Sequence, residues 1–299
     1  MLLSLVLACS PKNSAPAETG LSSTTDTVTE ATLSTLLSDA QAGDDILLHP
    51  DGFLVASDPI GDGGASLPTG TSLREIHLDG TVEVYAEGLV LPLGNDIDAD
   101  GNVYAVEWGG QGRLFKVGAD RAVSTLAAGM SYASNVVAHP NGVLYVTAWG
   151  DDAIYQVDPG TGERTTLVEG IDRPVGLALD ADGVHLLVSS FSHGEVHRVS
   201  TGGEVALLAS LPESGDGAAA DLVATDSGVY VTSFGGNCIY RVDDAGVVEV
   251  AAGTGEAGGS DGPALEATLD QPNGIAASAD GRTLYIQEFG GALRVLSLD

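Results

Sequence analysis

Oxygen-bearing side chains recur at one position of an internal repeat, and their types and spacing could support metal chemistry. The five residues stand at or near the start of short apolar runs and are Asp45, Asn95, Asn135, Asp221 and Asn273. Carboxylate and amide oxygens are the ligands that hard cations such as Ca²⁺ take in proteins. A fold that brings these positions into a ring would therefore create a calcium site. A second hypothesis stays open, in which the Asp and Asn side chains only accept hydrogen bonds from nearby backbone.

Three further residues depart from the repeat and are candidates for acid–base chemistry. Glu107 and Glu288 stand where other repeats have Ala148, Ser190 and Ser233. His193 is the best proton-transfer candidate by residue type, although an isolated histidine on a turn is also typical of a solvated surface. With Asp221 as a possible base for activating water, we consider four residues as catalytic candidates: Asp221, Glu107, Glu288 and His193.

The repeat predicts the elements that position these residues. Each copy has a short apolar run, a turn of the Asp-Gly, Asn-Gly or Ser-Gly kind, an alternating strand ending in Trp or Phe, a Gly-rich turn and further strands. The equivalent starts lie 50, 40, 40, 46 and 52 residues apart and are assigned to Asp45, Asn95, Asn135, Val175, Asp221 and Asn273. Six copies of this size predict an all-β, six-bladed β-propeller with four-stranded blades.

The N-terminal part of the repeat region predicts how the propeller closes. The last copy stops after three strands, so its fourth strand must come from elsewhere. Residues 34–45, STLLSDAQAGDD, match residues 124–135, STLAAGMSYASN, which include the fourth strand of another copy. We therefore expect Val28–Leu37 to supply the outer strand of the sixth blade and to remove an exposed sheet edge. A helix over residues 30–40 is the alternative.

The first residues resemble the lipobox of bacterial lipoproteins. The start MLLSLVLACS is an apolar run that ends in Val-Leu-Ala-Cys, and a Ser-, Thr-, Pro- and Ala-rich stretch follows it. The run is too short to span a bilayer. The resemblance implies a signal segment over residues 1–8, a lipid on Cys9, a flexible tether over 9–27 and a propeller domain over 28–299. Cys238 would then be a lone thiol, expected as a small buried residue in a strand.

The composition limits the partners. Eleven Lys and Arg against 42 Asp and Glu give a net charge of −31, while 43% of the residues are apolar. Such a surface repels phosphate backbones, so we expect no nucleic-acid partner. It attracts cations, or it serves as a solvated acidic coat that keeps an exported monomer soluble.

Landmarks in the last repeat resemble a known family. Residues 251–296 carry Gly-x-Gly, Asp-Gly, Ala and Pro-x-Gly in the order found in NHL repeats. Residues 28–299 as a whole are similar to NHL and SMP-30/gluconolactonase-like propellers, a fold that hosts both enzymes and binding modules. In the SMP-30-like enzymes a metal is held at these strand starts. The resemblance implies Asp45, Asn135 and Asp221 as matching ligands, whereas the fourth-blade ligand falls on Val175, which cannot ligate.

Two functions follow from these observations. The first is an exported, lipid-anchored binding module for a small molecule, glycan or protein at the channel mouth, touching the membrane only through its anchor. The second is a Ca²⁺-dependent hydrolase of lactones or esters. Aromatic residues that recur at the ends of the second strands would suit a ligand pocket at this mouth or pack the blades: Trp108, Trp149, Phe191, Phe234 and Phe289.

Overall fold

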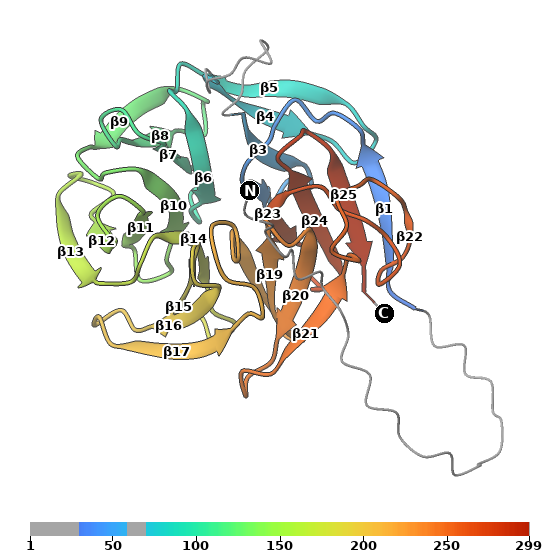
Figure 1. Ribbon diagram of the computed structural model, residues 1–299. Helices are drawn as coiled ribbons and strands as arrows, with labels where there is room; N and C mark the ends of the chain where they lie inside the picture. Colours follow the sequence, from blue (N-terminus) through green and yellow to red (C-terminus); the bar gives the residue numbers. More distant parts are fainter. Residues whose placement is uncertain (1–29, 59–69, 299) are drawn as a thin grey trace, which may run out of the picture.

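The computed structural model describes residues 30–58 and 70–298, and every regular element in these residues is a β-strand. Six antiparallel sheets surround a central channel as the blades of a propeller (Figure 1). In blades one to five the strand nearest the channel begins the blade and the later strands follow outward, whereas in blade six the N-terminal β1 lies outside β25. The prediction of an all-β, six-bladed propeller with four-stranded blades is confirmed.

The blades are listed from the channel outward. Blades one to three contain β2 (Ile46–Leu48), β3 (Leu54–Asp58), β4 (Ser72–Ile76) and β5 (Val82–Glu87); β6 (Pro92–Ile97), β7 (Val103–Glu107), β8 (Leu114–Val117) and β9 (Val123–Ala127); and β10 (Ala133–Ala138), β11 (Leu144–Ala148), β12 (Ala153–Val157) and β13 (Arg164–Glu169). Blades four to six contain β14 (Pro174–Leu179), β15 (Leu186–Ser190), β16 (Glu195–Val199) and β17 (Val205–Ser210); β18 (Leu222–Thr225), β19 (Gly228–Ser233), β20 (Cys238–Val242) and β21 (Val248–Ala252); and β23 (Pro272–Ala277), β24 (Thr283–Glu288), β25 (Leu293–Ser297) and β1 (Thr32–Leu37), with the short β22 (Gly262–Pro263) outside β1.

The N-terminal strand closes the ring as expected. β1 pairs antiparallel with β25, from Thr32 opposite Ser297 to Leu37 opposite Leu293. Leu33 is 1% exposed and packs into the core of the sixth blade. The helix considered as an alternative is therefore wrong, while the expected strand residues before Glu30 lie outside the described residues.

The channel is held by contacts between neighbouring blades. An apolar cluster fills each of the six junctions, as between Val55 and Val103 or between Tyr145 and Leu186. One position of the second strand adds a side-chain hydrogen bond to a backbone carbonyl of the next blade at five junctions, from Ser57, Thr147, Ser189, Thr232 and Gln287. Close packing on both flanks of every blade makes the channel a rigid frame for its side chains.

Candidate functional site

Only alternate blades contribute a side chain to the entrance ring of the channel. Opposite the hydroxyl residues of the second strands lie Asp45, Asn135 and Asp221, from blades one, three and five. In blades two, four and six the same position holds Gly94, Gly176 and Gly274. We call Asp45, Asn135 and Asp221 the channel cluster.

The glycines are required because the channel is narrow at this level. A Cβ at Gly94 would lie 2.3 Å from Cα of Asn135, and one at Gly274 would lie 2.7 Å from Cα of Asp45. At Gly176 it would lie 2.8 Å from Cα of Asp221. Heavy atoms do not approach this closely, so the entrance has room for three side chains and not for six.

This arrangement corrects the expected ring. The sequence alignment placed Asn95, Val175 and Asn273 at the ring position, one residue away from the true one. In every blade the true ring residue stands seven residues before the glycine of the turn after the first strand, as from Gly94 to Gly101 and from Gly274 to Gly281, so the sequence contained the signal that would have placed the glycines in the ring. The side-chain amide of Asn95 donates to Ser57 Oγ at 3.0 Å, and the side-chain amide of Asn273 donates to Asp44 Oδ2 at 2.8 Å.

The three members of the channel cluster meet one another. Asn135 Nδ2 donates to Asp221 Oδ1 at 3.0 Å. The carboxyl groups of Asp45 and Asp221 lie close enough for each to shift the pKa of the other. Side chains from blades one, three and five therefore converge at the channel mouth.

Backbone N–H groups occupy further positions on the same carboxyl groups. Asp45 accepts from the Ile46 amide at 2.8 Å and from the Asn95 amide of the next blade at 2.6 Å. Asp221 accepts from the Ile275 amide of the next blade at 3.2 Å. The backbone-capping hypothesis thus describes part of what these side chains do, because they fix strand starts across blade junctions.

The electrostatics of the cluster are those of buried acids close together. Burial, followed by the charge of Asp221, raises the pKa of Asp45 well above its usual range. Burial raises the pKa of Asp221 to about 6. The neighbouring Asp44 has its pKa raised by burial and then by the charge of Asp45. Among the described residues, no lysine, arginine or histidine forms an ion pair with any of these three carboxyl groups.

The donor chemistry of the cluster suits a hard cation, but the number of ligands is small. Two carboxyl groups and one amide offer oxygen atoms, whereas Ca²⁺ takes six to eight. Within residues 30–58 and 70–298, no three His, Cys, Asp or Glu side chains are disposed as a metal centre. A calcium ion bound by Asp45, Asn135 and Asp221 would have to complete its shell with water or ligand oxygens.

Glu107 and Glu288 are each held by an arginine of the same blade. The Glu107 carboxylate receives Arg113 Nε at 2.7 Å and Nη2 at 2.9 Å. Glu288 receives Nη1 of Arg294, which is fully buried, at 3.0 Å. Both glutamates stand six residues before their arginine, a spacing that the sequence shows and that could have revealed the pairs. The structure does not join either glutamate to the channel cluster by any contact between described residues.

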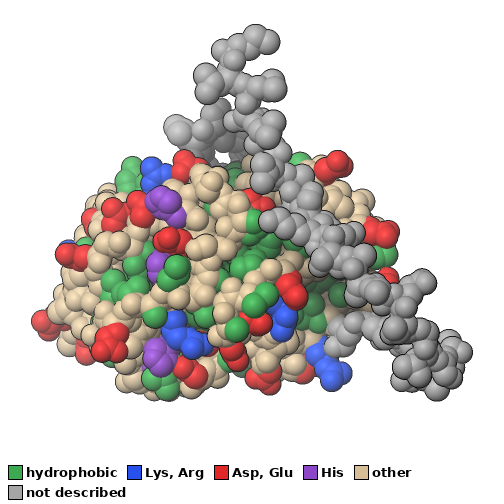
Figure 2. Space-filling view, turned by 60° about the horizontal axis from the view of Figure 1, so that its bottom comes forward, with side chains coloured by type: hydrophobic (Ala, Val, Ile, Leu, Met, Phe, Trp, Pro, Cys, Tyr) green, Lys and Arg blue, Asp and Glu red, His purple; other side chains and the backbone are tan. Residues whose placement is uncertain are grey.

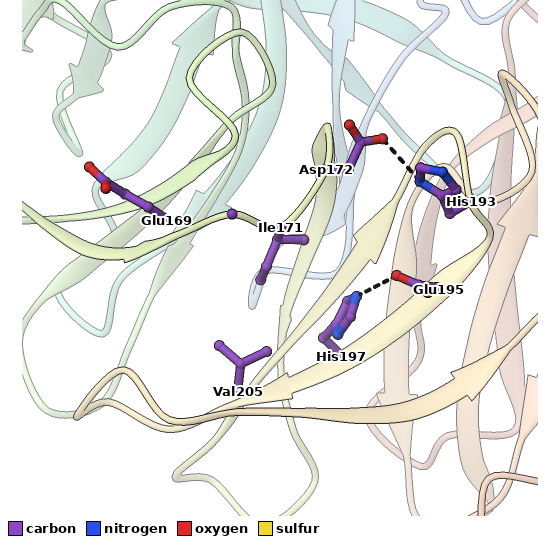
Figure 3. A pocket seen from close by; sticks show the side chains of 8 residues that line it. Glu169, Ile171, Asp172, His193, Glu195, His197 and Val205 are labelled. Atoms are coloured by element: carbon purple, nitrogen blue, oxygen red, sulfur yellow. Dashed lines mark hydrogen bonds and ion pairs between the residues drawn. The ribbon is translucent and has the colours of Figure 1, made fainter.

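His193 lies on the outer surface of blade four. Its Nδ1 is 3.0 Å from Asp172, and its side chain is 61% exposed. Figure 3 shows this pair beside a second one, His197 with Glu195, around a surface hollow that also touches Val205. His193 is therefore a solvated surface histidine away from the channel cluster, the alternative that its isolation in the sequence left open.

The expected aromatic residues form a rim at the same end of the channel as the cluster. The first strands begin where the second strands end, so Trp149 follows a residue paired with the start of β10. Trp108 and Trp149 lie 5.3 Å apart between ring centroids, and Tyr132 contacts both. Phe234 contacts Phe191 and Phe289. These contacts give the rings a packing role, while Tyr132 and Phe289 also keep about 40% of their surface exposed.

Asp96 is a channel residue that the sequence analysis did not single out. It occupies a level two residues beyond Gly94, where the other blades have only apolar residues: Leu47, Val137, Ala178, Val223 and Ala276. Burial raises its pKa to about 6. The signal for it was a single Asp among apolar residues at one position of the repeat.

The cysteines require a second correction. Cys238 is fully buried in β20, as expected of a small residue in a strand, but it is disulfide-bonded and not a lone thiol. Cys9, the predicted signal segment and the tether lie outside the described residues. In the described part of the chain, no helix is long and apolar enough to cross a membrane.

The charge of the molecule is not confined to the channel. Figure 2 shows acidic side chains spread over the visible face, with few lysine or arginine side chains among them. This distribution fits a solvated acidic coat, so total charge does not by itself identify a ligand site.

Solved structures with this architecture come from proteins of different function. One is an auxiliary nutrient binding protein from Bacteroides ovatus, with a TM-score of 0.72 and 14% identity, covering 90% of this chain and 76% of the other. A second is a gluconolactonase from Xanthomonas campestris, with a TM-score of 0.68, 19% identity and 90% of both chains covered. A third is virginiamycin B lyase from Staphylococcus aureus, with a TM-score of 0.64, 16% identity and coverage of 90% and 99%.

These similarities establish the propeller fold and no closer relationship. Neither the comparison with protein families nor that with curated proteins gives a match to this sequence. At these identities a shared fold does not carry a shared activity.

Proposed function

We propose that this chain is an exported, lipid-anchored β-propeller that binds a small molecule, glycan or protein at the mouth of its channel. The convergence of Asp45, Asn135 and Asp221 carries the proposal, because three polar side chains meet at the centre of a rigid frame. Partly exposed aromatic rings stand at the same end of the channel. A few polar groups within an aromatic border are typical of ligand sites. The similarity in fold to a nutrient binding protein is consistent with this function.

A Ca²⁺-dependent hydrolase is the second candidate, and one observation favours it. Asp45 and Asp221 are buried side by side without a basic partner in the described structure, which is the electrostatic setting a cation would relieve. Asp45, Asn135 and Asp221 would hold the ion, and a bound Ca²⁺ would polarise a lactone or ester carbonyl. The protein itself contributes the buried oxygens and the narrow frame that orients them.

Calcium-dependent melting tests the calcium site that the second candidate requires. Ca²⁺ is expected to raise the melting temperature further as its concentration rises, with a logarithmic dependence, because it binds the folded cluster and not the unfolded chain. Asp221→Asn removes a cluster charge and is expected to weaken this shift, while Asp244→Asn removes an exposed charge of the same blade and is expected to leave it unchanged. Mg²⁺ at equal ionic strength controls for general screening. A shift that Mg²⁺ reproduces in full, or that survives Asp221→Asn, contradicts the calcium site.

Activity then distinguishes the enzyme from the binding module. A screen of lactones and aryl esters, with and without chelator, is expected to show chelator-sensitive hydrolysis if the second candidate is correct. A calcium response without hydrolysis supports the binding module, in which the cation organises the channel mouth.

The anchor has a test of its own. Cys9→Ser is expected to move the protein from the membrane fraction to the soluble fraction. The chain has two cysteines, so a lipid thioether on Cys9 and an intrachain disulfide at Cys238 are alternatives. Intact mass of the membrane-fraction protein, before and after reduction, decides between them. Unchanged membrane association of Cys9→Ser contradicts the anchor.

A further inference from the structure

A second cavity lies inside the channel, beyond the channel cluster. It has a volume of about 380 Å³ and begins at Asp45, Asn135 and Asp221. Its walls follow the first strands toward their ends, as far as Pro140 in the turn after β10. The cavity is open to solvent and lies within the size range of small-molecule sites.

Beyond the entrance ring, one level of the cavity wall is apolar except at one residue. At the level two residues beyond the entrance ring, Leu47, Val137, Val223 and Ala276 face Asp96. Asp96 accepts the Ile97 amide at 2.8 Å and the Ala138 amide of the next blade at 2.8 Å. Two hydrogen bonds hold the carboxyl group in place without supplying a positive charge.

Near the entrance ring, the cavity has a buried acceptor without a donor. Asn95 is 5% exposed, and its Oδ1 has no hydrogen-bond partner. The Ser57 hydroxyl proton is already given to the Leu93 carbonyl, so Asn95 must use its amide hydrogen on Ser57 and its oxygen is left over. Asp45 and Asp221 add carboxyl acceptors to the same cavity, and no lysine, arginine or histidine among the described residues forms an ion pair with either.

We propose that this cavity binds a small organic monocation, with its ammonium group on Asp96 and its apolar body against the channel walls. Charge complementarity selects this occupant. Asp45, Asp96 and Asp221 face the cavity, and no lysine, arginine or histidine among the described residues forms an ion pair with them. A buried carboxylate is stabilised by an opposite charge and a desolvated contact, both of which an alkylammonium ion supplies. The apolar side chains favour a hydrocarbon tail, because its burial removes apolar surface from water. A bare metal ion would leave most of the apolar wall in contact with water.

Binding of hexylammonium, measured by calorimetry at fixed ionic strength and pH 7.5, tests the proposal. The uncharged 1-hexanol has the same tail and is expected to bind at least ten-fold more weakly. Asp96→Asn is expected to weaken hexylammonium binding at least ten-fold, whereas Asp100→Asn on the exposed turn of the same hairpin leaves it unchanged. Ala276→Leu fills the cavity without altering charge and is expected to abolish binding of both compounds.

Several outcomes would overturn the proposal, and they are separate from the calcium test. Equal binding of hexanol and hexylammonium, undiminished binding by both Asp96→Asn and Ala276→Leu, or no binding to the wild-type protein contradicts it. If Asp100→Asn weakens hexylammonium binding as much as Asp96→Asn does, the amine is attracted only to the acidic surface and the proposal is wrong. If the Ca²⁺ response persists in Asp96→Asn while amine binding is lost, the cavity and the channel mouth are independent sites.

Discussion

The acids of this propeller that are at most 7% exposed fall into two groups with opposite surroundings. Five buried acids away from the channel cluster each face an arginine, as in Asp58 with Arg74, Glu75 with Arg121, Glu107 with Arg113, Asp180 with Arg198 and Glu288 with Arg294. The two buried acids of the channel cluster, Asp45 and Asp221, face each other. Of the 11 Lys and Arg of the chain, almost half pair with buried acids elsewhere, and none in the described residues pairs with these two. The ion pairs of the blade acids stabilise the fold. The channel acids have no such pair among the described residues, so a cationic ligand can supply the missing positive charge.

Breaking a blade pair should have the largest effect. Arg294→Met leaves Glu288 buried without its partner and is expected to reduce the free energy of unfolding by about 3–5 kcal/mol. Arg241→Met is the matched control, because its pair with Glu249 is on the surface and is worth at most about 1 kcal/mol. Chemical denaturation of both variants measures the difference. Equal losses would show that the blade pairs are not structural.

Crowding the channel entrance should have the next largest effect. Gly94→Ala places a Cβ against the backbone of Asn135 and is expected to cost about 3 kcal/mol, the upper part of the range for overpacking. Gly290→Ala meets no atom within 4 Å and is expected to be nearly neutral. If thermal unfolding finds both variants equally stable, the alternation of side chain and glycine in the ring is not a steric requirement.

Neutralising a channel acid should have the smallest effect on the free energy of unfolding, and it should raise stability where the other two changes lower it. The pKa of Asp221 is raised in the folded protein to about 6, so its proton stabilises the fold below about pH 4 and this contribution is lost as the pH rises through 6. Asp221→Asn avoids that loss. Relative to wild type it is expected to gain about 1–2 kcal/mol between pH 4 and pH 7.

Glu107→Gln provides the contrast at a blade pair. It weakens the two-point contact with Arg113 and is expected to lose about 1–3 kcal/mol at pH 7. Denaturation curves at several pH values compare the two variants. A loss of stability in Asp221→Asn at pH 7 as large as that in Glu107→Gln would remove the distinction between the two groups of acids.

The sequence predicted the propeller and its closure because both depend on repeated local patterns. The match between residues 34–45 and 124–135 located the closing strand, since outer strands share a pattern wherever they occur. The alternation of turns and strands fixed the number of blades. Such features require no knowledge of which side chains meet across the channel.

The site was predicted only in part, because the partners of a side chain across the channel are three-dimensional. Asp45, Asn135 and Asp221 were placed at the ring and lie there, whereas Asn95 and Asn273 were each placed one residue away from the glycine that occupies the ring position. The arginine partners of Glu107 and Glu288 were visible as a repeated spacing. Asp96 was visible as the one acid in an apolar column of the repeat, which becomes informative once that column is known to line a cavity.

A carboxyl ¹³C NMR titration of the metal-free protein tests the central claim most directly. The account holds that, among the described residues, Asp45 and Asp221 are buried together with no cation partner. The carboxyl groups of Asp221 and Asp96 should therefore both titrate near pH 6 in the wild-type protein, and Asp221→Asn should remove one of these transitions and leave that of Asp96. Asp244→Asn should leave both in place. If Asp221→Asn removes no transition near pH 6 because Asp221 titrates below about pH 4.5, as expected of a solvated or ion-paired carboxyl group, the claim of unpartnered channel acids is wrong.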